Sequence, residues 1–276
     1  MFHKFVNRYV IEGKLVAVTA LHIGAAEDVF KPDGCRNPFF RNANELPMIP
    51  GSSLKGAMRS FLEQFLLSES GKDMLLTGEN HIPAGTCTGQ APCIDPAKDE
   101  KLKKMLKKKD GSASLKLSEY LFGTPGGEKG RLCLVCRLFG SPYSAAKFSV
   151  RDARVIENTF QRAFEIRSGV SIDRDFGTGI SGRKYDVEVV PEGTAFSFRA
   201  VLENGDKKEW EAIKLLLKAM EIGMVSIGGM KSRGLGEVRI QDVRFQHINE
   251  KNIAGYLSGE EIGFQHLEET DIQEGK

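Results

Sequence analysis

The sequence predicts an α+β fold built on a ferredoxin-like core. Two stretches, 54–67 and 208–223, carry apolar residues at helical spacing, and strand-like stretches precede, separate and follow them. The order strand, helix, strands, helix, strand is that of a ferredoxin-like unit. The chain has 276 residues, of which 41% are hydrophobic, so it is long enough to build this core and to carry insertions.

The first half of this unit is a strand, a long loop and a helix. Residues 6–21 mix apolar with polar side chains, as a strand does, and prolines and glycines punctuate the loop at 29–50. The helix is expected from about Leu54 to Leu67. Either Ser52 or Ser53 is placed to cap it by accepting hydrogen bonds from its free amides.

The second half follows a stretch of different composition. Between residues 71 and 140, glycines, prolines, four of the five cysteines and a lysine run break the periodicity, which predicts an insertion. The strands expected after it are 147–156, 163–172, 185–190 and 194–202. The helix at 208–223 and a strand at 236–245 complete the core, and residues 246–276 are interpreted as an acidic tail.

The cysteines predict a structural zinc site. Cys133 and Cys136 have the two-residue gap that lets both thiolates reach one ion, and Cys87 with Cys93 supplies a second pair. The second gap is longer than usual, so His81 is an alternative ligand. Buried cysteines without metal are the competing interpretation.

A glycine-rich segment at 226–236 is the clearest candidate for contact with a nucleic acid. Its glycines let the backbone approach a ligand closely, and its cations suit phosphates. The residues expected to bind are Gly228, Gly229, Lys231, Ser232 and Arg233. Taken alone, a flexible turn between helix and strand would look the same.

The start of the first helix is a second candidate for phosphate contact. Ser52 and Ser53 lie where amides are unpaired and the helix dipole is positive, and Lys55 and Arg59 are one turn apart on one face. Four arginines on predicted strand surfaces are further candidates to line a groove for the nucleic acid, although strand surfaces commonly carry such charges: Arg151, Arg154, Arg162 and Arg167.

The bulk charge does not identify a partner by itself. Thirty-nine Lys and Arg against 37 Asp and Glu give a net charge of +2, although acidic residues gather near the C-terminus and leave the rest more basic. No run approaches the roughly 20 apolar residues of a membrane helix, and the start lacks the pattern of a signal peptide. A cytoplasmic location without membrane contact is expected.

Four motifs in order resemble those of the RAMP superfamily. They are Leu21-His22-Ile23-Gly24, then Ile49-Pro50-Gly51-Ser52-Ser53-Leu54-Lys55-Gly56, then Ile172-Asp173-Arg174, and last the glycine-rich residues 228–236. The resemblance spans about residues 9–245. It is strongest to the repeated backbone subunit of type III CRISPR effector complexes.

The resemblance implies a single RAMP domain over 1–276 with a modified, RRM-like form of the ferredoxin fold. Such a subunit contacts the sugar-phosphate backbone of guide RNA and holds the guide for pairing with target RNA in antiviral defence. It forms oligomers with other RAMP subunits and with the large subunit of the complex. It also implies a hairpin finger at 174–187 that pushes between bases. The RNA contacts expected there are Arg174, Arg183 and Lys184, with His22 after the first strand.

Whether this subunit cuts RNA depends on the loop that contains Arg36. Family members that cut target RNA have an aspartate two positions before a proline, and Arg36 occupies that position before Pro38. An arginine suits holding a phosphate. The alternative is a metal-dependent endoribonuclease that uses Asp33 or Asp28 with Mg²⁺ or another divalent ion. A guide-processing endonuclease is disfavoured because the chain has only five histidines.

Overall fold

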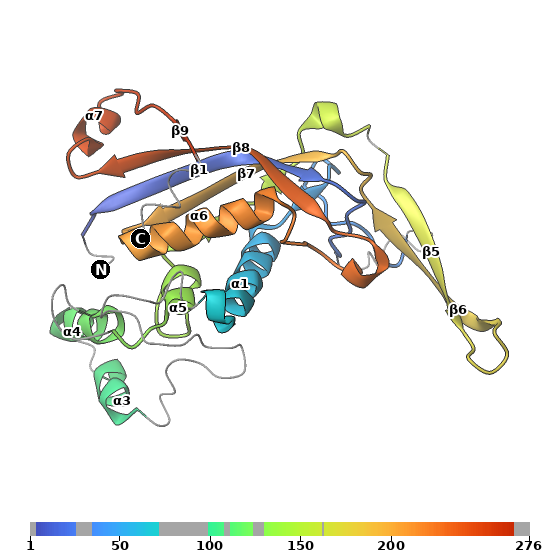
Figure 1. The fold of residues 1–276 in the computed structure, drawn as a ribbon, viewed down its shortest axis with the longest axis horizontal. Coiled ribbons are helices and arrows are strands. Elements are labelled where there is room, and N and C mark those ends of the chain that lie inside the picture. The colour runs from blue at the N-terminus through green and yellow to red at the C-terminus, as the bar shows by residue number, and fades with distance from the viewer. Residues whose placement is uncertain are drawn as a thin grey trace.

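The computed structural model describes residues 4–25, 35–71, 99–107, 111–123, 130–161 and 163–267. Its centre is an antiparallel sheet in the order β3-β7-β1-β8-β9 (Figure 1). The bounds of these strands are β1 Asn7–Ala17, β3 Phe148–Val150, β7 Ala195–Glu203, β8 Val238–Asn249 and β9 Gln265–His266. The fold is therefore mixed α+β with a central antiparallel sheet, as the sequence predicts.

The chain order of the core elements is β1, α1, β3, β7, α6 and β8. β1 is central and pairs antiparallel with β7 on one side and β8 on the other. Crossovers of this kind, with a helix between strands that are not adjacent, are compatible with a ferredoxin-like fold.

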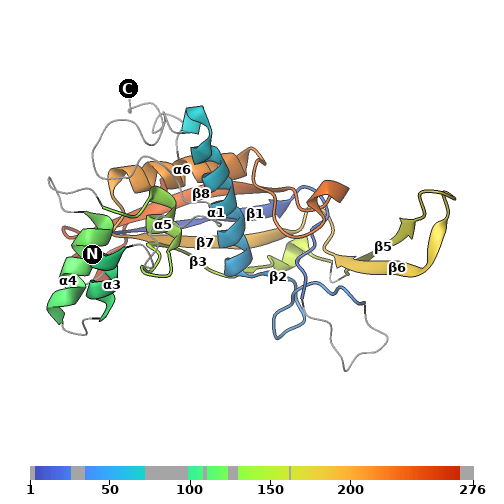
Figure 2. The same ribbon diagram turned by 90° about the horizontal axis from the view of Figure 1, so that it is seen from below.

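Two helices, α1 (Gly51–Leu67) and α6 (Lys207–Glu221), cover one face of the sheet (Figures 1 and 2). Every third or fourth residue of α1 from Leu54 to Leu66 is buried, so the helical spacing is confirmed. The expected start and cap are wrong. The helix begins at Gly51 with Pro50 in the cap position and no side-chain cap, so Ser52 and Ser53 lie inside its first turn.

Between α1 and β3 the structure describes three shorter helices. They are α3 (Glu100–Lys107), α4 (Gly111–Phe122) and α5 (Leu134–Phe139). All six residues of α5 are buried, and the helix packs beside α1 and β3. The stretch expected as an insertion at 71–140 therefore ends in residues of the hydrophobic core, while α3 and α4 lie at the end of the molecule away from β5 and β6 (Figure 2).

A separate antiparallel pair, β5 (Glu165–Ile172) and β6 (Gly179–Val189), projects from one end of the sheet (Figure 1). The finger expected at 174–187 covers only the turn and most of β6. The first strand of the hairpin, β5, lies before the expected range. A smaller pair is formed by β2 (Met48–Ile49) and β4 (Ala153–Arg154). Two 3₁₀ turns occupy Glu157–Thr159 and Lys231–Arg233.

The C-terminal part continues the sheet further than expected. β8 runs to Asn249, where it pairs with Asn7, so residues 246–249 belong to the core sheet and not to a tail. The short helix α7 (Ile253–Leu257) leads to β9. Within the described ranges, no helix has the length and apolar character needed to cross a membrane.

Candidate nucleic-acid interface

The segment after β1 and the glycine-rich segment meet at the end of the sheet from which the hairpin projects. His22 is buried, and its Nδ1 donates to the carbonyl oxygen of Glu188 on β6 at 2.7 Å. Its own carbonyl oxygen accepts from the backbone N–H of Gly229 at 3.0 Å. His22 therefore joins two of the sequence motifs to the hairpin base from an interior position.

The glycine-rich segment is a packed turn whose shape requires glycine. Gly228 has a φ of +82°, and a Cβ there would lie 2.1 Å from the carbonyl oxygen of His22. Gly236 has a φ of +89°, and a Cβ there would lie 2.2 Å from the carbonyl oxygen of Ile227. Only glycine combines this conformation with such close backbone approach, so the segment is fixed in place.

The cations of this turn are displayed at the surface. Lys231, Ser232 and Arg233 form an exposed 3₁₀ turn. The guanidinium of Arg233 lies 5.5 Å from the ring centre of Tyr185 on β6 and also contacts its hydroxyl group. In Figure 2 the segment between α6 and β8 accordingly lies beside the base of the hairpin.

The loop that carries Arg36 packs on the same hairpin. The Asn37 side-chain amide donates to the carbonyl oxygen of Asp186 at 2.8 Å, and the Glu188 N–H donates to the Asn37 carbonyl oxygen at 3.0 Å. Arg36 and Lys184 are exposed and line one hollow of about 490 Å³ between loop and hairpin. The sequence indicated both cations separately, and the structure brings them together.

Glu188 holds this arrangement from inside. Its carboxylate accepts from the backbone N–H of Phe39 at 2.7 Å and forms an ion pair with Arg41. The side chain is almost fully buried, where an unpaired carboxylate would be costly. Sequence reasoning missed it, although a glutamate within the apolar run Val187–Val190 was a signal for a buried partner.

The start of α1 is anchored elsewhere. Gly51 donates to Asp152 Oδ1 at 2.7 Å, and a Cβ at Gly51 would lie 2.3 Å from the carbonyl oxygen of Val150. Lys55 is half-buried, and burial followed by repulsion from Arg59 lowers its pKa. Arg59 donates to Glu63 at 2.9 Å and to the Gly140 carbonyl oxygen at 3.1 Å, so it also ties α1 to α5.

The outer hairpin presents the remaining predicted contacts. Arg174 and Arg183 are exposed, in the turn and on β6. Asp173 shapes the turn by accepting from the backbone N–H groups of Asp175 and Phe176 at 2.8 and 3.1 Å. Phe176 is 82% exposed, which places a bare aromatic ring at the tip, a feature that sequence reasoning missed.

The zinc and catalytic predictions fall largely beyond what the structure describes. Cys133 and Cys136 are 1% and 3% exposed and lie in the core at the start of α5. This placement is compatible with two ligands of a structural site. Cys87, Cys93 and His81 lie outside the described residues, as do Asp28, Asp33 and Arg162.

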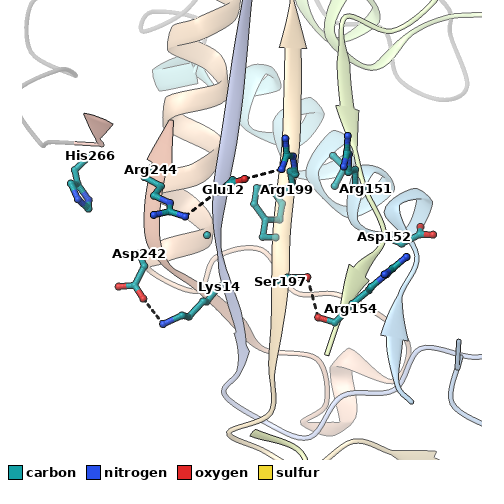
Figure 3. Close-up of a pocket in the computed structure, with 13 residues that line it drawn as sticks. Glu12, Lys14, Arg151, Asp152, Arg154, Ser197, Arg199, Asp242, Arg244 and His266 are labelled. Atoms are coloured by element: carbon teal, nitrogen blue, oxygen red, sulfur yellow. Dashed lines mark hydrogen bonds and ion pairs between the residues drawn. The ribbon is translucent and has the colours of Figure 1, made fainter. Parts of the chain in front are cut away.

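The face of the sheet opposite the helices holds a second, larger hollow of about 1090 Å³ (Figure 3). Arg151 and Arg154, two of the arginines expected to line a groove for RNA, border this hollow, and their contact with RNA stays a prediction. Charged residues from the strands also line it, and sequence reasoning missed them although they recur at every second position: Glu12, Lys14, Arg199, Asp242 and Arg244.

Ion pairs connect these strand residues across the open face. Glu12 on the central strand accepts from Arg199 at 3.0 Å and from Arg244 at 3.1 Å. Lys14 pairs with Asp242 at 2.9 Å, and this hydrogen bond and the lysine charge lower the pKa of Asp242. Figure 3 shows both groups pointing out of the sheet.

Comparison with known proteins identifies the family. A family model described as the RAMP superfamily matches residues 14–239. The CRISPR system Cms endoribonuclease Csm3 of Methanocaldococcus jannaschii is 27% identical over 248 residues, which cover 86% of this chain and 80% of that protein. The protein of the same name from Methanothermobacter thermautotrophicus is 23% identical over 269 residues, covering 88% of this chain and 87% of its own. The chain belongs to the RAMP superfamily.

Proposed function

We propose that the chain is a guide-RNA-binding backbone subunit of a type III CRISPR effector complex, which holds the guide for pairing with target RNA. The observation that carries this proposal is the meeting of three segments with predicted RNA contacts at the hairpin base. The segment at His22, the loop at Arg36 and the turn at 231–233 come together around β6. The named relatives, each a CRISPR system protein, support the same reading.

The surface suits RNA backbone more than RNA bases. Arg36, Lys184, Lys231 and Arg233 are exposed cations on one end of the molecule. Cations and nearby backbone amides contact phosphates, which are the same in every sequence. A subunit that holds RNA in this way leaves base edges open for pairing with a second strand.

The same proposal includes the neighbouring subunits and the cellular location of the protein. The subunit is expected to lie beside other RAMP subunits and the large subunit along the guide, in the cytoplasm, with an RRM-like form of the ferredoxin fold. The hairpin of β5 and β6 is then the finger that reaches into the bound strand. Its exposed Phe176 gives it an apolar tip that can stack on a base.

Holding, not cutting, is the role proposed for the loop at Arg36. The relatives are named as endoribonucleases, and metal-assisted cleavage would require a carboxylate to hold the ion. Arg36 places a guanidinium beside Lys184 instead, and a fork of donors pairs with phosphate. Asp33 and Asp28 remain the residues on which a nuclease role would depend.

The test is RNA binding by paired variants. Arg36→Ala with Lys184→Ala removes both cations from the hollow at the hairpin base. Lys207→Ala with Lys251→Ala removes the same charge from exposed positions at the other end of the sheet. Single-stranded RNA binding is measured by fluorescence anisotropy from low to high salt for both.

The first variant is expected to bind at least tenfold more weakly and to lower the slope of log affinity against log salt by about 1.4, or about 0.7 for each lost phosphate contact. The control variant is expected to keep the slope of the unaltered chain. Equal losses in the two variants would show that the hollow holds no RNA and that the effect is general charge.

A further inference from the structure

The open face of the sheet is a charged hollow at some distance from the hairpin base. Five Lys and Arg side chains line it against three carboxylates, which leaves a net charge of +2 before His266 is counted. The cations are Lys14, Arg151, Arg154, Arg199 and Arg244. The α1 and α6 helices lie on the opposite face of the sheet, so these two helices do not cover this one (Figures 1 and 2).

The positive charge is not evenly neutralised. Glu12 is shared between Arg199 and Arg244, and Asp152 accepts a hydrogen bond from the first turn of α1. Arg151 and Arg154 are exposed, and the described residues give neither of them an ion pair. The excess charge is therefore concentrated at the β3 and β4 side of the hollow.

The chemistry of this hollow suits carboxylates on a polypeptide. Among the described residues that line it, the aromatic rings are Phe198, which is buried, and His266, so charged side chains far outnumber surfaces on which bases could stack. Carboxylates and cations also alternate across the strands. A peptide can place its charges singly between them, whereas an RNA backbone brings a negative charge at every step and would meet Glu12 and Asp242.

We propose that the occupant is the chain's own acidic segment, residues 268–276. This segment carries Glu268, Glu269, Asp271 and Glu274 against a single Lys276. The described chain reaches its last strand, β9, at Gln265–His266, and His266 lines the hollow. The segment therefore starts at the rim of a surface of opposite charge.

The length of the segment fits the distance. Four strand spacings of about 4.8 Å separate β9 from β3, or about 19 Å across the sheet. Nine residues extend to about 30 Å, which is enough to cross the face and reach Arg151 and Arg154. A short tether also raises the local concentration to the millimolar range, so weak ion pairs suffice for occupancy.

The occupied hollow keeps polyanions off this face. The binding of RNA is then directed to the hairpin base, where Arg36, Lys184, Lys231 and Arg233 are exposed. The inference goes beyond the proposed function, since the contact between segment and hollow exists whether or not the chain holds guide RNA.

The experiment uses the full-length chain and a labelled peptide with the sequence of residues 268–276. One variant neutralises the tethered segment through Glu268→Gln, Glu269→Gln, Asp271→Asn and Glu274→Gln. Peptide binding is followed by fluorescence anisotropy at low salt. The neutralised variant is expected to bind the peptide about tenfold more tightly than the unaltered chain, whose hollow is already occupied.

Adding Arg151→Ala and Arg154→Ala to the neutralised variant is expected to abolish this gain, whereas adding Lys207→Ala and Lys251→Ala is not. Equal peptide binding by the unaltered and neutralised chains would overturn the proposal. So would tight binding of a nine-nucleotide RNA to the neutralised variant that depends on Arg151 and Arg154, because the hollow would then be an RNA site. RNA binding by the variant Arg36→Ala with Lys184→Ala is measured separately, and its result tests only the proposed function.

Discussion

At the scale of single residues, a buried carboxylate connects the helices to the sheet. Glu209 is fully buried and accepts from Lys147 Nζ at 2.6 Å and from Arg137 Nε at 2.8 Å. It also completes a capping box at the start of α6 with Asp206. Burial lowers the pKa of Lys147 although the charge of Glu209 opposes this, so the pair depends on close geometry.

Glu209→Gln is expected to lower the free energy of unfolding by about 3–5 kcal/mol, because the buried Lys147 loses its counter-charge and Arg137 keeps only its ion pair with Asp206. Urea unfolding followed by circular dichroism measures it. Glu250→Gln is the control, since Glu250 pairs with Lys4 at an exposed site, and its loss is expected to leave the free energy of unfolding nearly unchanged. A loss of similar size in both variants would contradict the role of Glu209.

Gly228→Ala is expected to weaken RNA binding by displacing the glycine-rich turn, because the added Cβ would lie 2.1 Å from the His22 carbonyl oxygen. Gly234→Ala is a matched control: its φ is +80°, but no atom lies within 4 Å of the added Cβ. It should cost only about 1 kcal/mol of stability through backbone strain, with RNA affinity retained. Equal RNA affinity in the two variants would count against a fixed turn.

Sequence reasoning can indicate residues whose partners are close in the chain. Lys231 and Arg233 were indicated by the glycines around them, which are neighbours in the chain. Glu188 and Glu209 were missed because their partners are distant: Arg41 lies 147 residues from Glu188, and Arg137 lies 72 residues from Glu209. A buried carboxylate cannot be matched to its cation until the fold brings the two together.

At the scale of elements, the hairpin of β5 and β6 combines a fixed base with an exposed end. Its base packs through Val187 and Val189 in a small apolar cluster with Leu235 of the glycine-rich turn. Its outer part leaves Ile172 and Phe176 exposed by 64% and 82%. Apolar groups displayed in this way mark a contact surface.

Phe176→Ala is expected to leave the free energy of unfolding within about 0.5 kcal/mol and to weaken RNA binding by about 1–3 kcal/mol, the usual contribution of one stacked base. Leu257→Ala is the control, since Leu257 is 77% exposed on α7. Urea unfolding and RNA titration measure the two effects. Unchanged RNA affinity would exclude the tip from the binding surface.

Three stacked rings join β1, β8 and α6. Tyr9 lies 4.2 Å from Trp210 and 4.3 Å from His247 between ring centres. Burial lowers the pKa of His247 below its ordinary value of about 6.5. As the pH falls below about 6.5, the unfolded chain takes up a proton that the folded chain resists, so stability is expected to fall.

His247→Phe keeps the stack and removes the titration. The difference in unfolding free energy between pH 7.5 and pH 5.5 is expected to be smaller in this variant than in the unaltered chain, as measured by urea unfolding at both values. An unchanged difference would assign the pH dependence to other groups.

The helices and strands of the core were predictable from periodicity, but their ends were not. The start of α1 is set by Asp152, which accepts from Gly51 across 101 residues of chain. β8 extends to Asn249 because Asn7 pairs with it there. The positions of these ends depend on partners that are distant in the sequence, so a local sequence pattern does not predict them.

At the scale of the whole molecule, the sequence predicted the class of fold, a mixed α+β arrangement. It did not predict that α5 is part of the core. Cys133 and Cys136 were taken to lie in a polar insertion, whereas Leu132 and Leu134 beside them are also buried. The zinc site stays a prediction.

The purified chain is expected to hold one zinc ion, which Cys87→Ser with Cys93→Ser should release. Elemental mass spectrometry measures the metal, and urea unfolding measures stability. Because a structural zinc contributes folding energy, chelation is expected to lower the free energy of unfolding. A metal-free chain of full stability would make Cys133 and Cys136 ordinary core residues.

The assembled complex, with guide RNA, labelled target RNA and Mg²⁺, is expected to bind the target without cuts from this subunit. Arg36→Asp restores the carboxylate that the family resemblance implies for a cutting subunit, and it is expected to introduce Mg²⁺-dependent cuts. Cuts by the unaltered complex that Asp33→Ala or Asp28→Ala abolishes would contradict the holding role.

The edge of the sheet formed by β8 and β9 affects whether strands of different molecules can pair when the protein is concentrated. Within the described part of the chain, β9 pairs only with Arg244 and Phe245 of the twelve residues of β8. Asp242 has a φ of +53°, and the pairing of β8 with β1 shifts register beside it. A break of this kind interrupts the regular row of amides and carbonyls that a strand from another molecule needs. This edge of the sheet therefore resists growth by strand addition.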